Sequence, residues 1–215
     1  MEIARNSVVG VLGYGVTGQS VLRYLANFDC SLVLFDTRKP PKDFLKIPGI
    51  QYNWQIESWS RSDIDLLFVS PGVRLDLPIL QQARDYGIEI VSDLDLFFSE
   101  VDKPVFGITG TNGKSTVTTM LGHVFARNGL NCKYGGNLGV PALDLISSDV
   151  DVYILELSSF QLERAASQTY EAATILNITE DHLDHHLNMD AYIRSKHKIF
   201  SKAKVSIFNR DDKNT

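Results

Sequence analysis

The sequence predicts an α/β fold with two successive units, and two observations lead to it. Short apolar, β-branched runs alternate with helical patterns along all 215 residues, which is typical of parallel strands joined by crossover helices. Two glycine-containing loops, residues 13–18 and 110–116, each follow a predicted strand and precede a predicted helix. We therefore expect a Rossmann-like N-terminal domain followed by part of a P-loop α/β ATPase-type central domain.

A polar stretch that ends at Pro104 lies between the two loops and is typical of a linker. We expect the first domain to span residues 1–93 and the second to span residues 94–215. The second unit ends shortly after a predicted strand, with no helix to cover it, so we expect this unit to be incomplete.

Strands are predicted in the first domain over residues 7–12, 31–35, 65–70 and 88–91. One helix is indicated by apolar residues at helical spacing, namely Val21, Leu22, Leu25 and Phe28. A second helix is expected over residues 77–86, where Gly87 ends it. The proline-bearing, aperiodic segment 39–62 predicts no element.

Strands are predicted in the second domain over residues 105–109, 152–157, 173–176 and 205–208. A helix that stops at Gly129 is indicated by an apolar stripe made of Val117, Met120, Leu121, Val124 and Phe125. Further helices are expected over residues 94–98 and 190–201.

Composition and charge restrict the function. Lys and Arg number 21 against 26 Asp and Glu, so the net charge is −5, which does not suit non-specific binding of nucleic acid. Cys30 and Cys132 have no metal-ligand spacing and cannot form a disulfide framework. No apolar run reaches the length of a signal core or a membrane span. We expect a soluble, cytoplasmic monomer that binds neither nucleic acid nor membranes.

The first loop carries a GxGxxG pattern in Gly13, Gly15 and Gly18. Glycines allow a tight turn and close approach to a phosphate, and the following helix offers free amides and the positive end of its dipole. Asp36 ends the second strand, where it can accept hydrogen bonds from a ribose or a base. The pattern predicts a nucleotide site, and the alternative is a glycine turn required only for helix packing.

The second loop departs from the strict P-loop pattern, because its first glycine position is Ile108. Gly110 and Gly113 still allow backbone amides to surround a phosphate, Lys114 neutralises the phosphate, and Ser115 can reach a magnesium ion. This arrangement predicts an ATP site. The alternative is a glycine turn with a surface lysine.

Glu156 follows four apolar strand residues, a usual position for a second magnesium ligand in P-loop enzymes. The alternative interpretation is that Glu156 is a solvent-facing carboxylate at the end of a strand. Four histidines gather in one segment, namely His182, His185, His186 and His197. A zinc site is one interpretation, but we do not expect two of these histidines to share one helix face as metal ligands. We expect one functional histidine, His182, and three solvated ones.

Lys196 lies at the centre of an apolar helical face. This face is made of Tyr192, Ile193, Ile199 and Phe200. The ordinary explanation is a lysine whose ammonium group extends along the helix to solvent. The functional alternative is a desolvated amine with a lowered pKa that reacts with electrophiles, including carbon dioxide.

Together these residues resemble the Mur ligases of peptidoglycan synthesis, and within that family the enzyme that adds D-glutamate. The similar segments are residues 13–18, 36–38, 69–73, 108–116, 135–139, 155–162, 176–184 and 192–196. They span nearly the whole chain. The run 108–115 also fits folylpolyglutamate synthases, whereas 70–73 and 157–162 resemble the glutamate-adding Mur enzyme specifically.

The resemblance implies roles for individual residues. The UDP part of the substrate is expected at Gly15, Val16, Thr17, Asp36, Thr37, Arg38, Ser70, Pro71 and Gly72. The muramoyl part is expected at Asn137 and His182. ATP is expected at Gly110, Thr111, Asn112, Gly113, Lys114, Ser115 and Thr116. The expected catalytic residues are Lys114, Glu156, His182 and Lys196. Two Mg²⁺ ions are expected at Ser115, Glu156, His182 and Lys196, the last as a carbamate.

The resemblance also implies a reaction. ATP would phosphorylate the L-alanine carboxylate of UDP-N-acetylmuramoyl-L-alanine, and the amine of D-glutamate would displace the phosphate. Family members carry the rest of the ATP domain and a third domain that binds D-glutamate, and nothing in this sequence corresponds to either. We therefore expect a truncated chain that is inactive alone.

Other classes remain open. A NAD-dependent dehydrogenase accounts for the first loop but leaves the second without a role. A kinase or a plain ATPase accounts for the second loop but not the first. A non-catalytic nucleotide-binding module, another Mur ligase and a folylpolyglutamate synthase-like ligase complete the alternatives.

Overall fold

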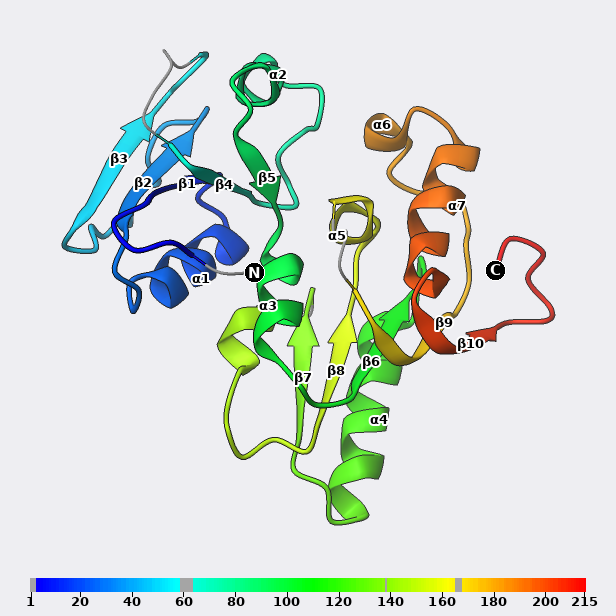
Figure 1. Ribbon diagram of the computed structural model, residues 1–215. Helices are drawn as coiled ribbons and strands as arrows, with labels where there is room; N and C mark the ends of the chain where they lie inside the picture. Colours follow the sequence, from blue (N-terminus) through cyan, green and yellow to red (C-terminus); the bar gives the residue numbers. More distant parts are fainter. Residues whose placement is uncertain (1–2, 59–63, 138, 165–167) are drawn as a thin grey trace. The chain divides into compact units, whose positions relative to one another are not determined.

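The structure, a computed structural model, describes residues 3–58, 64–137, 139–164 and 168–215 (Figure 1). The chain forms two compact units, Met1–Leu96 and Phe97–Thr215, whereas the boundary expected from the sequence lies between residues 93 and 94. Within the described residues each unit contains one sheet of five parallel strands. The α/β class predicted from the sequence is thereby confirmed.

The first unit has the strand order β3-β2-β1-β4-β5. Its strands are β1 (Val8–Leu12), β2 (Ser31–Asp36), β3 (Ile50–Trp54), β4 (Leu66–Val69) and β5 (Glu89–Val91). Its helices are α1 (Val16–Leu25), between β1 and β2, and α2 (Pro78–Asp85), between β4 and β5. From β1 the chain continues to β2 and β3 on one side of the sheet centre, and from β4 it continues to β5 on the other side. Because such crossovers are right-handed, α1 and α2 cover opposite faces, and a crevice opens at the carboxyl ends of β1 and β4.

Strand β3 lies in the segment for which the sequence predicts no element. It forms an edge of the sheet, pairs only with β2 among the described strands, and keeps its residues half-buried or exposed. An edge strand of this kind shows neither a continuous apolar run nor a clean alternation, so periodicity does not reveal it.

The second unit has the strand order β10-β9-β6-β8-β7. Its strands are β6 (Val105–Thr109), β7 (Cys132–Gly136), β8 (Val152–Glu156), β9 (Tyr170–Ile175) and β10 (Ala203–Phe208). Its helices are α4 (Lys114–Arg127), α5 (Ser159–Arg164), α6 (Leu183–His186) and α7 (Met189–His197), with α3 (Asp93–Glu100) crossing the division between the units. Two 3₁₀ turns are η1 (Ala142–Leu145) and η2 (Lys198–Phe200).

The sequence prediction differs from this second unit in several elements. Strand β7 and helices α5 and α6 are not predicted, β9 begins at Tyr170 rather than residue 173, and the helix expected over 190–201 is α7 followed by η2. Strand β7 is another edge strand, and its two glycines hide any strand pattern. Helices α5 and α6 are too short for a helical period to be recognised.

Neighbouring residues of β6 contact opposite layers, as the pleat of a strand requires. The Phe106 ring lies 5.1 Å from the ring of Phe125 on α4. A Cβ at Gly107 would lie 2.9 Å from the ring of Tyr170 and 3.1 Å from Ile199 of η2. Glycine at position 107 therefore gives η2 the space to pack on the sheet.

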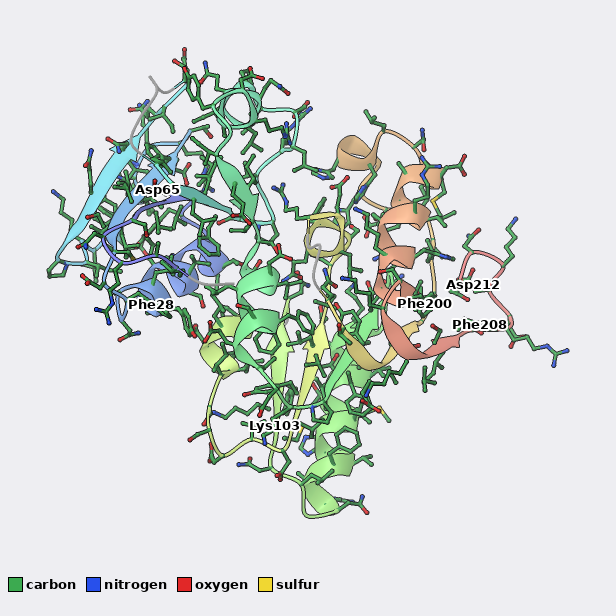
Figure 2. All side chains as sticks on the ribbon, viewed as in Figure 1. Phe28, Asp65, Lys103, Phe200, Phe208 and Asp212 are labelled. Carbon is green, nitrogen blue, oxygen red and sulfur yellow. The ribbon has the colours of Figure 1, made fainter. Side chains whose placement is uncertain are left out.

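The apolar stripe of α4 forms a helix as predicted, but part of it is exposed. Met120 is 61% and Val124 is 52% exposed. They line an open groove of about 380 Å³, together with residues that include Val117, Leu121 and Ile207. Phe208, labelled in Figure 2, is also 63% exposed at the end of β10. This face of the second unit is therefore apolar and accessible.

Both cysteines are free thiols and half-buried. Burial raises the pKa of Cys30, with a further contribution from the charge of Asp29, and burial also raises the pKa of Cys132. Neither thiol is therefore activated as a nucleophile. Among the helices of the described ranges, none combines the length and apolarity needed to cross a bilayer.

Candidate nucleotide sites at the two glycine loops

The three glycines of the first loop have different roles. Gly13 has a φ of 100°, a conformation that favours glycine. A Cβ at Gly18 would overlap the carbonyl oxygen of Gly13, so this glycine allows α1 to pack against the loop. A Cβ at Gly15 would meet no other atom within 4 Å, and this glycine precedes the first turn of α1. The loop therefore presents open space in front of a helix N-terminus, which is the geometry of a phosphate site.

Asp36 is almost completely buried at the end of β2. One carboxylate oxygen accepts hydrogen bonds from the Arg38 backbone amide at 2.8 Å and from Arg38 Nε at 3.0 Å. The other accepts from the Tyr14 amide at 2.7 Å and from the Arg38 guanidinium at 2.8 Å. Burial alone raises the pKa of Asp36, but these hydrogen bonds outweigh it and the pKa is lowered. Asp36 therefore holds the glycine loop and Arg38 in place.

The turn after β4 also joins the first loop. Ser70 Oγ donates a hydrogen bond of 2.8 Å to the carbonyl of Gly13, and the Val73 amide donates one of 3.0 Å to the carbonyl of Ser70. Other residues expected to contact UDP are at least partly accessible, namely Val16, Thr17, Thr37, Arg38, Pro71 and Gly72. The structure thus brings the segments 13–18, 36–38 and 70–72 to one edge of the sheet.

An aromatic cluster lies beside this loop, and no sequence pattern singled it out. The Tyr14 ring lies 5.3 Å from Phe44 and 5.4 Å from Trp54, and the Phe44 ring lies 4.8 Å from Tyr52. Tyr52 and Trp54 occupy alternate positions of β3, so both project to one face of the sheet. The signal that could have revealed the cluster is this alternation, in a segment where no strand was predicted.

The second loop is fixed by Asn177, which follows β9. Its backbone carbonyl accepts from the Thr111 amide at 2.9 Å, and its side chain exchanges hydrogen bonds with Asn112 at 2.9 and 3.1 Å. Gly110 and Gly113 have φ values of 154° and 80°, both unfavourable for other residues. Asn177 is a positioning residue that the sequence patterns did not reveal.

Lys114 and Ser115 open α4 directly after this loop. The Lys114 ammonium donates a hydrogen bond of 2.9 Å to the carbonyl of Thr111, so the side chain folds back over the loop. Ser115 Oγ donates to Glu156 Oε2 at 2.7 Å, and Asn137 Nδ2 donates to Glu156 Oε1 at 2.8 Å. Residues 114, 115, 137 and 156 are therefore gathered at the carboxyl ends of the strands, where ligands of parallel sheets bind.

Glu156 and Ser115 offer the oxygen donors that Mg²⁺ prefers. Glu156 is only 2% exposed, and its hydrogen-bond partners in this group are two neutral side chains. A buried carboxylate with neutral partners suits a cation as an additional partner. Gly136, with a φ of 98°, turns the chain so that the Asn137 backbone amide donates to the Glu156 carbonyl at 2.8 Å. The residues present therefore fit a magnesium ion.

Lys196 is 2% exposed on α7 and points inward, as the helical wheel predicts. Its ammonium donates to the carbonyl of Gly110 at 2.9 Å and lies 4.7 Å from the centre of the Tyr192 ring. Burial lowers the pKa of Lys196 to about 7, with a contribution from the nearby Lys114 charge, and Asp181 opposes the shift. A substantial fraction of this amine is therefore neutral near pH 7.

His182 lies in the segment between β9 and α6. It precedes α6 with a φ of 52°, and its side chain is 48% exposed. Its ring contacts Phe160 at 5.1 Å and Tyr192 at 6.4 Å, and Nε2 lies 3.5 Å from Asp181. Tyr192 thus contacts both His182 and Lys196.

The expectation that the other three histidines are solvated is wrong. His186 is 3% exposed and its Nε2 lies 2.8 Å from Ser159 Oγ, while His185 Nε2 lies 3.1 Å from Glu163. His197 Nε2 lies 2.8 Å from the carbonyl of Asn214. Burial lowers the pKa of His186, although the Glu163 charge opposes the shift. The short helix α5, which the sequence did not predict, supplies the partners of His185 and His186.

Both units match known protein families. Residues 108–215 match the family described as Mur ligase middle domain, and residues 7–92 match the one described as Mur ligase MurD-like, N-terminal domain. The chain belongs to the Mur ligase family. In this Mur ligase chain both glycine loops lie inside the matched regions, and the middle-domain match begins within β6.

Curated relatives carry the name UDP-N-acetylmuramoylalanine–D-glutamate ligase. The Haemophilus influenzae (strain PittEE) protein is 38% identical over 223 residues, covering 100% of this chain and 50% of the relative. The Saccharophagus degradans protein is 42% identical over 222 residues, covering 98% of this chain and 48% of the relative. The chain thus spans about half the length of the curated relatives it matches.

Solved structures support the fold. UDP-N-acetylmuramate-alanine ligase from Thermotoga maritima matches with a TM-score of 0.58 at 23% identity, over 97% of this chain and 50% of that one. UDP-N-acetylmuramate:L-alanyl-gamma-D-glutamyl-meso-diaminopimelate ligase from Neisseria meningitides gives a TM-score of 0.60 at 17% identity, over 97% of this chain and 73% of that one. At these identities the likeness concerns the fold alone.

Proposed function

We propose that this chain provides the UDP-substrate and ATP sites of a ligase that joins D-glutamate to UDP-N-acetylmuramoyl-L-alanine in peptidoglycan precursor synthesis. One observation carries the proposal: relatives 38% and 42% identical over nearly the whole chain bear the name of that enzyme. The substrates are small polar molecules, so we also propose a cytoplasmic protein. We further propose that it acts as a monomer.

The second loop is assigned to ATP. Backbone amides of residues 110–113 and the Lys114 ammonium surround the phosphates, and Thr116 follows in the first turn of α4. Ser115 and Glu156 would hold Mg²⁺, which neutralises charge on the phosphate oxygens when bound. Asn137 keeps Glu156 oriented through its 2.8 Å hydrogen bond, in addition to its proposed contact with the muramoyl substrate.

The first loop is assigned to UDP. Both oxygens of Asp36 already accept two hydrogen bonds each, so a direct bond from a ribose would displace one of them. We therefore assign Asp36 to positioning, and the exposed Arg38 guanidinium and the amides of residues 15–17 to ligand contact. This arrangement favours UDP over NAD, because NAD binding at such a loop uses the free acidic oxygen for the ribose hydroxyls.

The proposed reaction has two steps. The L-alanine carboxylate attacks the γ-phosphorus of ATP, which forms an acyl phosphate and releases ADP. The D-glutamate amine then attacks the acyl carbon, phosphate leaves, and the amide forms after loss of a proton. Lys114 stabilises the charge that develops on the transferred phosphoryl group. Lys196 is proposed to act as a carbamate, formed when its neutral amine adds to CO₂ with release of a proton, and His182 is proposed to join it as a metal ligand.

Calorimetric titration of the 215-residue chain tests the assignment. We expect heat from UDP-N-acetylmuramoyl-L-alanine and, in a separate titration, from MgATP, but none from NAD. Lys114→Ala should weaken ATP binding and leave the muramoyl titration unchanged. Binding of NAD in place of the UDP ligand would support the dehydrogenase alternative instead.

A second titration distinguishes between members of the family. Three ligands are titrated into the chain: UDP-N-acetylmuramate, UDP-N-acetylmuramoyl-L-alanine, and the product of the proposed reaction, in which the latter also carries D-glutamate. We expect all three to bind through UDP, and UDP-N-acetylmuramoyl-L-alanine to bind at least as tightly as the other two. Clearly tighter binding of UDP-N-acetylmuramate would indicate a ligase that adds the first amino acid.

A further inference from the structure

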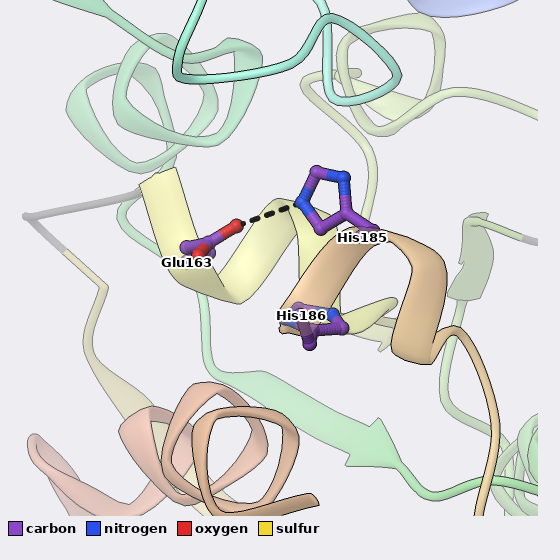
Figure 3. A group of neighbouring side chains, drawn as sticks. All are labelled: Glu163, His185 and His186. Atoms are coloured by element: carbon purple, nitrogen blue, oxygen red, sulfur yellow. Dashed lines mark hydrogen bonds and ion pairs between the residues drawn. The ribbon is translucent and has the colours of Figure 1, made fainter. Parts of the chain in front are cut away.

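Three potential metal ligands converge where helices α5 and α6 meet (Figure 3). Glu163 comes from α5, and His185 and His186 come from α6. Their ligand atoms all lie within 4.8 Å of one another, and within the described ranges no other set of three His, Cys, Asp or Glu residues does so. None of the three has a role in the phosphate chemistry proposed above.

The spacing inside this trio matches that of ligands sharing one metal ion. His185 Nε2 and Glu163 Oε2 are 3.1 Å apart. Two ligands bound tetrahedrally to one zinc ion, each at about 2.0–2.1 Å, are separated by about 3.3 Å. The pair is therefore close to the separation that metal binding requires, and the third ligand atom, on His186, lies within 4.8 Å of both.

Neighbouring rings hold the two imidazoles in place. The Phe160 ring stacks on His186 at 5.4 Å with an interplanar angle of 7°, and it meets His185 edge-on at 4.4 Å. His186 is further held by the Ser159 hydroxyl, 2.8 Å from its Nε2. His186 is 3% exposed, whereas the His185 and Glu163 side chains are 16% and 29% exposed. The site is thus ordered at its base and open to solvent on one side.

We propose that Glu163, His185 and His186 form a binding site for a transition-metal dication of the Zn²⁺ type. Two imidazoles and one carboxylate favour such ions over Mg²⁺, which prefers oxygen ligands. Water fills the remaining position. The ion joins α5 to α6 and thereby orders the segment that begins at His182, three residues before the first histidine ligand.

Cobalt and zinc titrations of the tag-free chain test the site, with Mg²⁺ at about 10 mM present throughout so that oxygen sites stay occupied. Co²⁺ in a tetrahedral site gives intense visible absorption, which reports coordination directly. Zn²⁺ is then added to displace Co²⁺, and melting temperature is followed in parallel, since a ligand that binds only the folded state stabilises it. We expect one equivalent of metal.

Four variants test the site. His185→Ala and Glu163→Gln each remove one ligand and should weaken Co²⁺ and Zn²⁺ binding by about 100-fold. His123→Ala is the matched control, because His123 is exposed on α4, and it should bind as the unchanged chain does. The melting curve of each variant without metal first shows whether it is folded. Glu163→Asp keeps a carboxylate and should therefore retain part of the affinity for Co²⁺ and Zn²⁺.

Several results would overturn the proposal. The absence of a cobalt spectrum in the unchanged chain would leave the trio as a hydrogen-bonded cluster only. Equal loss in the control variant would point to non-specific binding. If His182→Ala loses Co²⁺ and Zn²⁺ binding while His185→Ala keeps it, the ion binds at the proposed magnesium site instead.

Discussion

The two glycine loops use the same backbone arrangement but differ in the side chains around it. Each follows a parallel strand and opens a helix. At the first loop, both carboxylate oxygens of the buried Asp36 accept hydrogen bonds, from the Tyr14 amide of the loop and from Arg38. At the second, the buried acid Glu156 bonds to Ser115 and Asn137, and two lysines, Lys114 and Lys196, bond to carbonyls of the loop itself.

This difference suits the first loop to binding a phosphate and the second loop to phosphoryl transfer. At the first loop, backbone amides, a helix N-terminus and the Arg38 guanidinium, which is paired with Asp36, are sufficient to hold a phosphate. Transfer of a phosphoryl group requires charges placed where negative charge develops, and around the second loop Lys114 and Lys196 both bond to the loop itself. The predictions below test this contrast, from the largest expected effect to the smallest.

The packing role of the first loop is tested by Gly18→Ala. Its Cβ would overlap the Gly13 carbonyl oxygen, so the helix must move, and we expect a loss of about 3 kcal/mol in the free energy of unfolding. Urea denaturation measures it. Gly15→Ala is the control, because its Cβ meets nothing within 4 Å, and it should reduce UDP-ligand binding while changing stability little. Equal destabilisation by both changes would contradict the division of roles.

The buried lysine beside the second loop makes stability depend on pH. Burial lowers the pKa of Lys196 to about 7 from an ordinary 10.5, so between these values the unfolded chain binds a proton that the folded chain has released. Stability due to this group therefore rises with pH across that window, by up to about 1.4 kcal/mol per pH unit. Lys196→Met should remove the slope in CO₂-free urea denaturation between about pH 7.5 and 9.5. Lys198→Met, an exposed neighbour, should leave it unchanged.

The charge on the second loop is tested by Lys114→Ala. The ammonium is expected to form charge-assisted hydrogen bonds with ATP, so its loss should weaken MgATP binding by about 10- to 100-fold. Calorimetry measures the affinity. Lys133→Ala, a lysine of β7 outside the loop, serves as control. An unchanged ATP affinity in Lys114→Ala would mean that the second loop does not hold the phosphates.

The smallest effect is expected for Asp36→Asn. The lowered pKa of Asp36 means that its stabilising contribution is present at pH values above about 4 and is lost as the pH falls through the lowered pKa. We expect the variant to be about 1 kcal/mol less stable at neutral pH, with the difference shrinking as the solution is made acidic. A difference that stays constant over this range would show that the carboxylate charge does not contribute.

Much of the fold follows from local patterns. The central strands β1, β4, β6 and β8 are apolar and buried, so their runs are visible in the sequence. The edge strands β3 and β7 are only half-buried and carry polar residues or glycines, and no periodicity marks them. The other two edge strands, β5 and β10, are predicted because they contain β-branched apolar residues, although β10 is mostly exposed. Local sequence therefore reports apolar runs rather than the place of a strand in its sheet.

The candidate sites divide in the same way. Glycine spacing identifies both loops, and the helical wheel correctly buries Lys196, because both depend on neighbours in sequence. Asn177, which bonds to residues 111 and 112, depends on a pairing between segments far apart in the chain. The burial of His186 depends on the unpredicted helix α5. Contacts of this range are set by tertiary packing, which single-sequence patterns do not contain.

The aromatic cluster at the first loop has an optical consequence. The sequence contains two tryptophans, Trp54 and Trp59, and both belong to the first unit. Trp54 lies 5.4 Å from the ring of Tyr14, a residue of the glycine loop itself. Displacement of that loop by a ligand changes the environment of an indole, so tryptophan emission reports events in the first unit. The sequence of the second unit contains no tryptophan, and its own ligands must be followed by another signal.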